Sequence, residues 1–201
     1  NNFDHRAQPV NCLCGLSKSA SDGSLDRLII QAILALHAAD GLFGRAQERA
    51  ALKEMSAPGA KGPRGIVVAG QSGIGKSRLL EIAEDDAKRN GALTMRGSCL
   101  DVGDAWPLHP LKEAAQRLAN GKRIPAVDRL VDILDDGLGK GADYDLLATV
   151  HGHLNALSES SRLVLILDGL QWADSTTKHL VRTLLSGLTD NNITLFAAIR
   201  N

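Results

Sequence analysis

The residues at positions 70–77 combine glycines, a lysine and a hydroxyl in a pattern that can hold a phosphate group. They read Gly70-Gln71-Ser72-Gly73-Ile74-Gly75-Lys76-Ser77. The series matches G-x-x-x-x-G-K-[ST] at every position. Because glycine has no Cβ, backbone N–H groups can approach a phosphate closely. In this pattern the lysine reaches the β- and γ-phosphates of a nucleotide, and the serine hydroxyl binds Mg²⁺. We therefore predict that these eight residues and Arg78 bind nucleotide, with Lys76 also catalytic and Ser77 a metal ligand.

The segments on both sides of this loop are those that a phosphate-binding loop requires. Residues 65–69 form a short apolar run with β-branched side chains, which is typical of a buried parallel strand. Residues 78–90 carry apolar side chains at helical spacing, and Asn90-Gly91 ends the predicted helix. The start of that helix adds unpaired N–H groups and the positive end of its dipole. The alternative is a glycine-rich turn before an ordinary helix, but the strand–loop–helix order favours nucleotide binding.

A second apolar run ends in an acidic residue. Residues 163–167 are all aliphatic, and Asp168 follows them. A central parallel strand would place this carboxylate at the carboxyl edge of the sheet, where ligands bind in open α/β folds. We predict that Asp168 holds Mg²⁺ through water. The alternative is a strand that merely stops at a polar residue.

Two further segments resemble AAA-type and signal-transducing (STAND) P-loop ATPases. Phe43-Gly44-Arg45, in a segment that continues to Leu52, is similar to the "hGRxxEhxxL" segment of these families. Residues 164–174, Val-Leu-Ile-Leu-Asp-Gly-Leu-Gln-Trp-Ala-Asp, resemble their "hhhLDDLQWAD" block. That block occurs in the ATP-binding regions of large LuxR-type regulators and of adenylate cyclases with an ATP domain. The resemblance extends over residues 42–200.

The resemblance implies ATP and Mg²⁺ as cofactors and assigns roles to several residues. Gly44 and Arg45 would lie on the adenine side of the site, and Asp168 would be the Walker B aspartate. Arg200 falls where these families place a residue that senses the γ-phosphate; the alternative is a charged residue at a strand end. The candidate catalytic residues are thus Lys76, Asp168, Arg200 and Asp174.

One departure from the family pattern concerns hydrolysis. These families usually carry a second acid directly after the metal aspartate, and this chain has Gly169. The missing acid would be the base that positions the attacking water. Asp174 matches the last position of the block, and whether it replaces that acid depends on geometry. An aspartate in place of Gly169 is expected to raise turnover if the missing acid limits hydrolysis.

Composition excludes several other classes. The chain has 201 residues, with 23 basic and 23 acidic side chains, so no global charge favours nucleic acid as a partner. No apolar run approaches the roughly 18 residues of a membrane span. Cys12, Cys14 and Cys99 cannot form a disulfide framework, and no second ligand pair completes a zinc site at Cys12-Leu13-Cys14. We interpret them as thiols of a cytoplasmic protein.

These features predict an α/β three-layer P-loop fold of the ASCE/AAA type, with a parallel sheet and helices on both faces. We expect residues 1–40 to form an arm with a packing helix over 25–39, and 41–201 to form the ATPase core. By resemblance, strand 193–199 lies between the P-loop strand and the Asp168 strand, and the core stops after its fourth strand, without its C-terminal lid. The other edge of the P-loop strand is then exposed unless the arm or a partner covers it.

The predicted function is that of a STAND-type ATPase domain in which Mg-ATP acts as a switch with slow hydrolysis to ADP. Its expected partners are ATP and ADP, together with an effector domain or a second copy outside this segment. Two alternatives remain open: a nucleotide-binding module without turnover, which Gly169 favours, and a small-molecule kinase. No N-K-x-D motif supports a guanine-specific GTPase.

Overall fold

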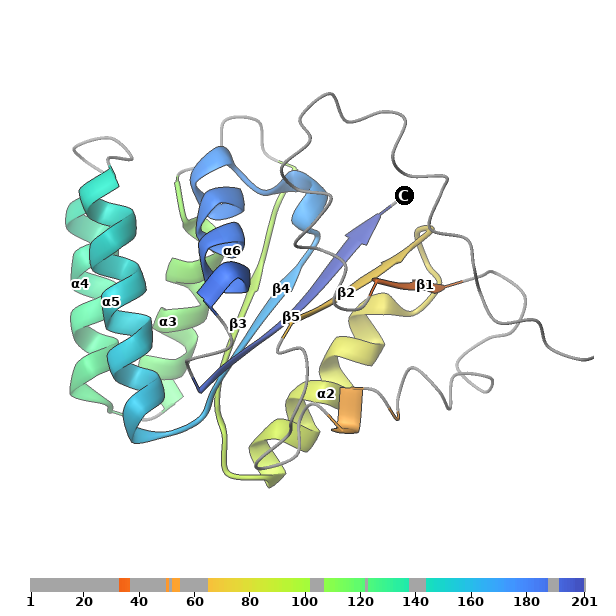
Figure 1. The fold of residues 1–201 in the computed structure, drawn as a ribbon, viewed down its shortest axis with the longest axis horizontal. Helices are drawn as coiled ribbons and strands as arrows, with labels where there is room; N and C mark the ends of the chain where they lie inside the picture. The colour runs from red at the N-terminus through yellow and green to blue at the C-terminus, as the bar shows by residue number, and fades with distance from the viewer. Residues whose placement is uncertain are drawn as a thin grey trace, which may run out of the picture.

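A five-stranded parallel sheet forms the centre of the computed structural model (Figure 1). The structure describes residues 33–36, 50, 52–54, 65–101, 107–121, 123–137, 144–187 and 192–200. The strands are β1 (Ile33–Leu36), β2 (Gly65–Gly70), β3 (Leu93–Ser98), β4 (Leu163–Asp168) and β5 (Ile193–Arg200). Their order in the sheet is β1-β2-β5-β4-β3. The predicted position of the last strand, between the P-loop strand and the Asp168 strand, is confirmed.

This strand order brings three predicted site elements to one edge of the sheet. β2 ends at Gly70, where the phosphate-binding loop begins, and its neighbour β5 pairs Arg200 with Gly70. On the other side of β5, β4 ends at Asp168, which pairs with Ser98 of β3. Because all these strands are parallel, their carboxyl ends lie together at the edge where α/β folds bind ligands.

Helices cover both faces of the sheet (Figure 1). The helix α2 (Lys76–Arg89) packs on one face, where it meets Val164 and Ile166 of β4. On the opposite face, the alternate residues Leu163, Leu165 and Leu167 form a second core with the remaining helices. These are α3 (His109–Gly121), α4 (Pro125–Gly137), α5 (Tyr144–Ser160) and α6 (Ser175–Gly187). The predicted three-layer architecture is therefore confirmed, and alternation along buried strands explains the two separate cores.

The N-terminal region contains a strand where the sequence predicts a helix. Residues Ile33–Leu36 form β1, which pairs in parallel with β2 from Ile33 opposite Val67 to Leu36 opposite Gly70. The helix prediction is wrong for these residues. A short apolar run fits both structures by periodicity alone, and pairing with an open sheet edge decides between them. The edge of the P-loop strand is consequently not exposed, because the arm, one of the two coverings expected for it, pairs with it.

Several predicted features lie outside the described residues. They include Gly44 and Arg45 on the expected adenine side, and Cys12 and Cys14. Leu52, the last position of the segment that resembles "hGRxxEhxxL", is described and is 2% exposed. It packs in the core beneath α2. Among the described residues, no helix is long and apolar enough to cross a membrane.

Candidate functional site

The phosphate-binding loop has the backbone that its glycines permit. Gly73 has φ 78°, and Gly75, which precedes α2, has φ 90° and ψ 20°. Both lie in the left-handed region, where side chains with a Cβ are disfavoured. Gly75 also begins the helix, because its carbonyl oxygen accepts a hydrogen bond from the Leu79 N–H at 3.1 Å. The loop therefore turns directly from β2 into the first turn of α2.

The start of α2 and the ammonium of Lys76 make the inside of this loop electropositive. No side chain caps the N-terminus of α2, and the first turn contains no acidic residue. The ammonium of Lys76 donates hydrogen bonds to the carbonyl oxygens of Gly70 at 2.8 Å and Gln71 at 2.7 Å. The Lys76 side chain thus extends back across the loop, and its charge lies beside the N–H groups at the start of the helix. This arrangement is suited to an anionic group such as phosphate.

An open cavity of about 560 Å³ connects this loop with the ends of β4 and β5. Its lining residues come from the loop, from α2, from the turn after β4 and from β5. They are Ser72, Gly73, Gly75, Lys76, Ser77, Arg78, Glu81, Asp168, Gly169, Gln171, Trp172, Ala198 and Arg200. The predicted residues Lys76, Ser77, Asp168 and Arg200 therefore share one cavity. Asp174 is not part of its lining.

The donors in this cavity fit a magnesium ion. Ser77 offers a hydroxyl and Asp168 a carboxylate that is 21% exposed, and both line the same space. Mg²⁺ prefers oxygen ligands and keeps several waters when it binds through one or two carboxylates and phosphate oxygens. In the described part of the chain, no cluster of three His, Cys, Asp or Glu residues could hold a metal by itself. Ser77 and Asp168 can therefore form a Mg²⁺ site whose remaining ligands are phosphate oxygens and water.

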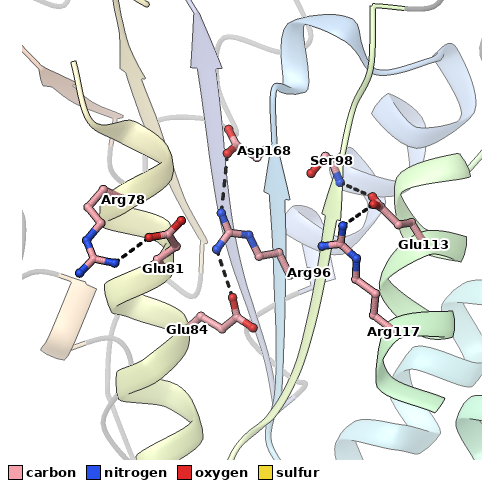
Figure 2. Close-up of polar contacts among 8 residues, drawn as sticks. All are labelled: Arg78, Glu81, Glu84, Arg96, Ser98, Glu113, Arg117 and Asp168. Carbon is pink, nitrogen blue, oxygen red and sulfur yellow. Dashed lines mark hydrogen bonds and ion pairs between the residues drawn. The ribbon is translucent and has the colours of Figure 1, made fainter. Parts of the chain in front are cut away.

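Ion pairs lie beside Asp168 and between the first residues of α2 (Figure 2). Arg96 of β3 lies between two carboxylates, with Nη1 3.2 Å from Oε2 of Glu84 and Nη2 3.9 Å from Oδ2 of Asp168. At the rim, Arg78 donates a hydrogen bond to Glu81 at 2.8 Å. That hydrogen bond lowers the pKa of Glu81 and raises the pKa of Arg78. Glu81 is therefore a carboxylate at neutral pH, and the paired arginine offsets its negative charge near the phosphate site.

Asp174 occupies the N-cap position of α6. One carboxylate oxygen accepts a hydrogen bond from the Thr177 N–H at 2.8 Å, and the other accepts one from the Thr177 hydroxyl. An aspartate that bonds the third residue of a helix in this way is a typical N-cap, which stabilises a helix by about 1 kcal/mol. This capping role explains why an aspartate stands at position 174, and it requires no role of Asp174 in hydrolysis.

Gly169 is required by the backbone beside Asp168. Its φ is 72°, and a Cβ built on it would lie 2.9 Å from the carbonyl oxygen of Cys99. The close approach arises because β3 and β4 remain paired beyond their ends, with the Cys99 N–H donating to the Asp168 carbonyl at 2.8 Å. An acidic side chain does not fit this backbone without displacement. We therefore expect Gly169→Asp to destabilise the folded protein and not to raise turnover.

Several lining residues are not assigned to the site by the sequence pattern, and two of them, Gln171 and Trp172, follow the end of β4. Gln171 accepts a hydrogen bond through Oε1 from the Arg200 N–H at 2.8 Å, which joins the turn after β4 to the end of β5. Trp172 is 43% exposed at the cavity wall. Both belong to the "QWAD" block, so their position three and four residues after Asp168, the predicted metal ligand, is the signal that could have placed them there.

Cys99 lies next to this site and is only 7% exposed. Burial, together with the charges of Asp174 and Asp168, raises the pKa of its thiol from 9.0 to about 12. Since the thiolate is the reactive form, we expect Cys99 to resist iodoacetamide in the folded protein through pH 9 and to react once the protein is unfolded. Peptide mass spectrometry on a Cys12→Ser, Cys14→Ser background measures this. Rapid native labelling at pH 8 would contradict the buried position.

Comparison with known proteins agrees with this geometry. The family described as AAA ATPase domain matches residues 41–196. A search of curated proteins gave no match. The matched range contains residues 70–77, Asp168 and the first half of β5, so the predicted resemblance to AAA-type P-loop ATPases is confirmed. The chain belongs to the AAA ATPase domain family of nucleotide-binding proteins.

Proposed function

We propose that this chain binds Mg-ATP in the cavity between residues 70–77 and the ends of β4 and β5, and that bound ATP acts as a conformational switch with slow hydrolysis. The observation that carries the proposal is the shared cavity itself. Residues of the 70–77 loop, the Asp168 carboxylate and Arg200 at the end of the middle strand all line it. Each of these groups would bind a different part of a Mg-nucleoside triphosphate.

In this proposal each residue has a separate task. The loop N–H groups and the start of α2 bind the phosphates, and Lys76 exchanges the carbonyl oxygens of Gly70 and Gln71 for phosphate oxygens. Ser77 and Asp168 hold Mg²⁺, which neutralises charge on the phosphates when it is bound. Arg200 lies at the end of β5, where its backbone is tied to Gln171. A contact between Arg200 and the γ-phosphate would therefore be transmitted to the turn after β4.

The role of a STAND-type switch belongs to the same proposal. ATP that contacts Arg200, and ADP that does not, would bias two arrangements of the β4 turn, and an effector domain or a second copy of the chain would respond to them. This form of regulation rests on the resemblance of the "QWAD" block to signal-transducing ATPases. It implies a cytoplasmic site of action, where ATP is available.

A second candidate function is a nucleotide-binding module without turnover. Two observations favour it. Gly169 has no side chain to act on water, and both carboxylate oxygens of Asp174 already bind Thr177. Calorimetry with ATP, with and without Mg²⁺, and single-turnover hydrolysis in the same sample separate the two candidates. Tight Mg-dependent binding with no ADP formed over hours would select the module, and slow release of phosphate would select the switch.

The assignment of Asp168 predicts a specific change in metal dependence. We expect Asp168→Asn to reduce the gain in ATP affinity that Mg²⁺ provides by roughly tenfold, because a carboxamide binds Mg²⁺ more weakly than a carboxylate. ATP affinity in the presence of EDTA should change little. Calorimetric titration at several Mg²⁺ concentrations measures this, with Asp145→Asn, an exposed position on α5, as the control. Equal Mg²⁺ dependence in Asp168→Asn and the unaltered protein would remove Asp168 from the site.

A further inference from the structure

We propose that Arg96 is a positioning residue that holds the Asp168 carboxylate before the metal arrives, competes with Mg²⁺ for it, and withdraws onto Glu84 when the metal binds. The inference rests on the proposed function, because it assumes that Asp168 is the metal carboxylate. It adds a second cation to the site, one that belongs to the protein and comes from the neighbouring strand β3.

The guanidinium of Arg96 is placed between two acids (Figure 2). Nη1 donates a hydrogen bond to Glu84 at 3.2 Å, and Nη2 lies 3.9 Å from the Asp168 carboxylate, which is an ion-pair distance without a hydrogen bond. The three side chains are largely buried, with 18% of Arg96, 15% of Glu84 and 21% of Asp168 exposed. Ion pairs at this burial are screened less by water and salt than surface pairs.

Arginine keeps its charge under all physiological conditions, so this cation cannot leave the site by losing a proton. It can only move. Its fork places one nitrogen toward each acid, and the shorter contact is the one to Glu84. A divalent ion at Asp168 would repel the guanidinium, while the bond to Glu84 gives it a partner that remains. In this proposal Arg96 pairs with both carboxylates in the absence of metal, as observed, and with Glu84 alone when metal is bound.

This exchange would connect metal binding with the helix that follows the phosphate-binding loop. Glu84 belongs to α2, which begins at Lys76, and it also pairs with Lys88 of the same helix at 2.7 Å. When Arg96 moves fully onto Glu84, the attraction between β3 and α2 increases. Metal at the end of β4 would therefore tighten the packing of the P-loop helix, through one side chain that binds neither nucleotide nor metal.

The two partners of Arg96 give opposite predictions, which a purely structural role would not produce. Arg96→Gln removes the competing cation, so we expect the Mg²⁺ concentration that half-saturates the gain in ATP affinity to fall by about fivefold. Glu84→Gln removes the hydrogen-bonded carboxylate of Arg96 and leaves Asp168 as its ion-pair partner, so we expect that concentration to rise by a similar factor. Arg96→Lys keeps the charge but has one nitrogen in place of the fork, so it should shift that concentration in the same direction as Arg96→Gln by a smaller factor.

The measurement is calorimetric ATP binding over a series of Mg²⁺ concentrations, with thermal unfolding of each variant as a check on folding. Arg117→Gln is the matched control, because it breaks another arginine–glutamate pair, with Glu113 at 2.6 Å, outside the cavity. If Arg96→Gln does not fold, the rise with Glu84→Gln decides alone. Shifts of Arg96→Gln and Glu84→Gln in the same direction, or no shift in either variant, would overturn the proposal for Arg96. Mg²⁺-independent ATP binding by the unaltered protein would instead overturn the metal role of Asp168, and this inference with it.

Discussion

Replacing Lys76 with alanine is expected to weaken Mg-ATP binding by about 2–5 kcal/mol, or roughly 30- to 5000-fold. The ammonium of Lys76 donates to the Gly70 and Gln71 carbonyl oxygens across the loop, so its charge lies where phosphate oxygens would bind. Alanine removes that charge and leaves the glycine backbone in place. Calorimetry with ATP and Mg²⁺ measures the loss.

The control for this experiment is Lys178→Ala. Lys178 is exposed on α6, on the opposite face of the sheet from α2, so its removal changes net charge equally without touching the cavity. Thermal unfolding of both variants shows whether the loop change has altered the fold. Unchanged ATP affinity in a folded Lys76→Ala protein would remove the phosphate-binding role of residues 70–77, and with it the proposed function.

The parts of the site that could be predicted from sequence are those that depend on local backbone chemistry. Gly73 and Gly75 occupy left-handed conformations that few other residues adopt, so their spacing before a lysine indicates one loop geometry. Asp168 follows a run of five aliphatic residues, a length that is typical of a buried strand. The place of strand 193–199 between the P-loop strand and the Asp168 strand followed from family resemblance and is observed. The loop and the strand need no knowledge of distant contacts, whereas the strand position came from the family.

The features that were missed depend on contacts between distant segments. β1 is an apolar run whose structure is decided by pairing with β2. The helix α6 was not assigned, although Asp174 as its cap followed by Leu180, Val181 and Leu184 is the signal that could have found it. Arg96 lies in the mixed strand β3, and nothing in its neighbours along the chain reveals two carboxylates from α2 and β4. Tertiary contacts override local patterns at each of these positions.

Gly169 is the position where the sequence and the structure lead to different expectations. The sequence indicates that Gly169 replaces a catalytic acid of the family, so an aspartate at this position could restore turnover. In the structure, a Cβ at this position would approach the backbone oxygen of Cys99 to 2.9 Å. The contact is with backbone held in a strand pair, which cannot move aside as a flexible side chain could. The pairing of β3 and β4 at their ends therefore explains why position 169 carries no acidic side chain.

We expect Gly169→Ala to destabilise the protein by about 2–4 kcal/mol, the sum of a left-handed backbone strain and a steric overlap. Gly91 supplies the matched control, because it has nearly the same φ, 77°, but a methyl group added there would meet nothing within 4 Å. Gly91→Ala should therefore lose only the backbone part, about 1–2 kcal/mol. Urea unfolding of both variants at unchanged m measures the difference. Gly169→Asp should be no more stable than Gly169→Ala and should not hydrolyse ATP faster in single turnover. A stable, faster Gly169→Asp protein would show that the strand ends can separate, and that the missing acid alone limits hydrolysis.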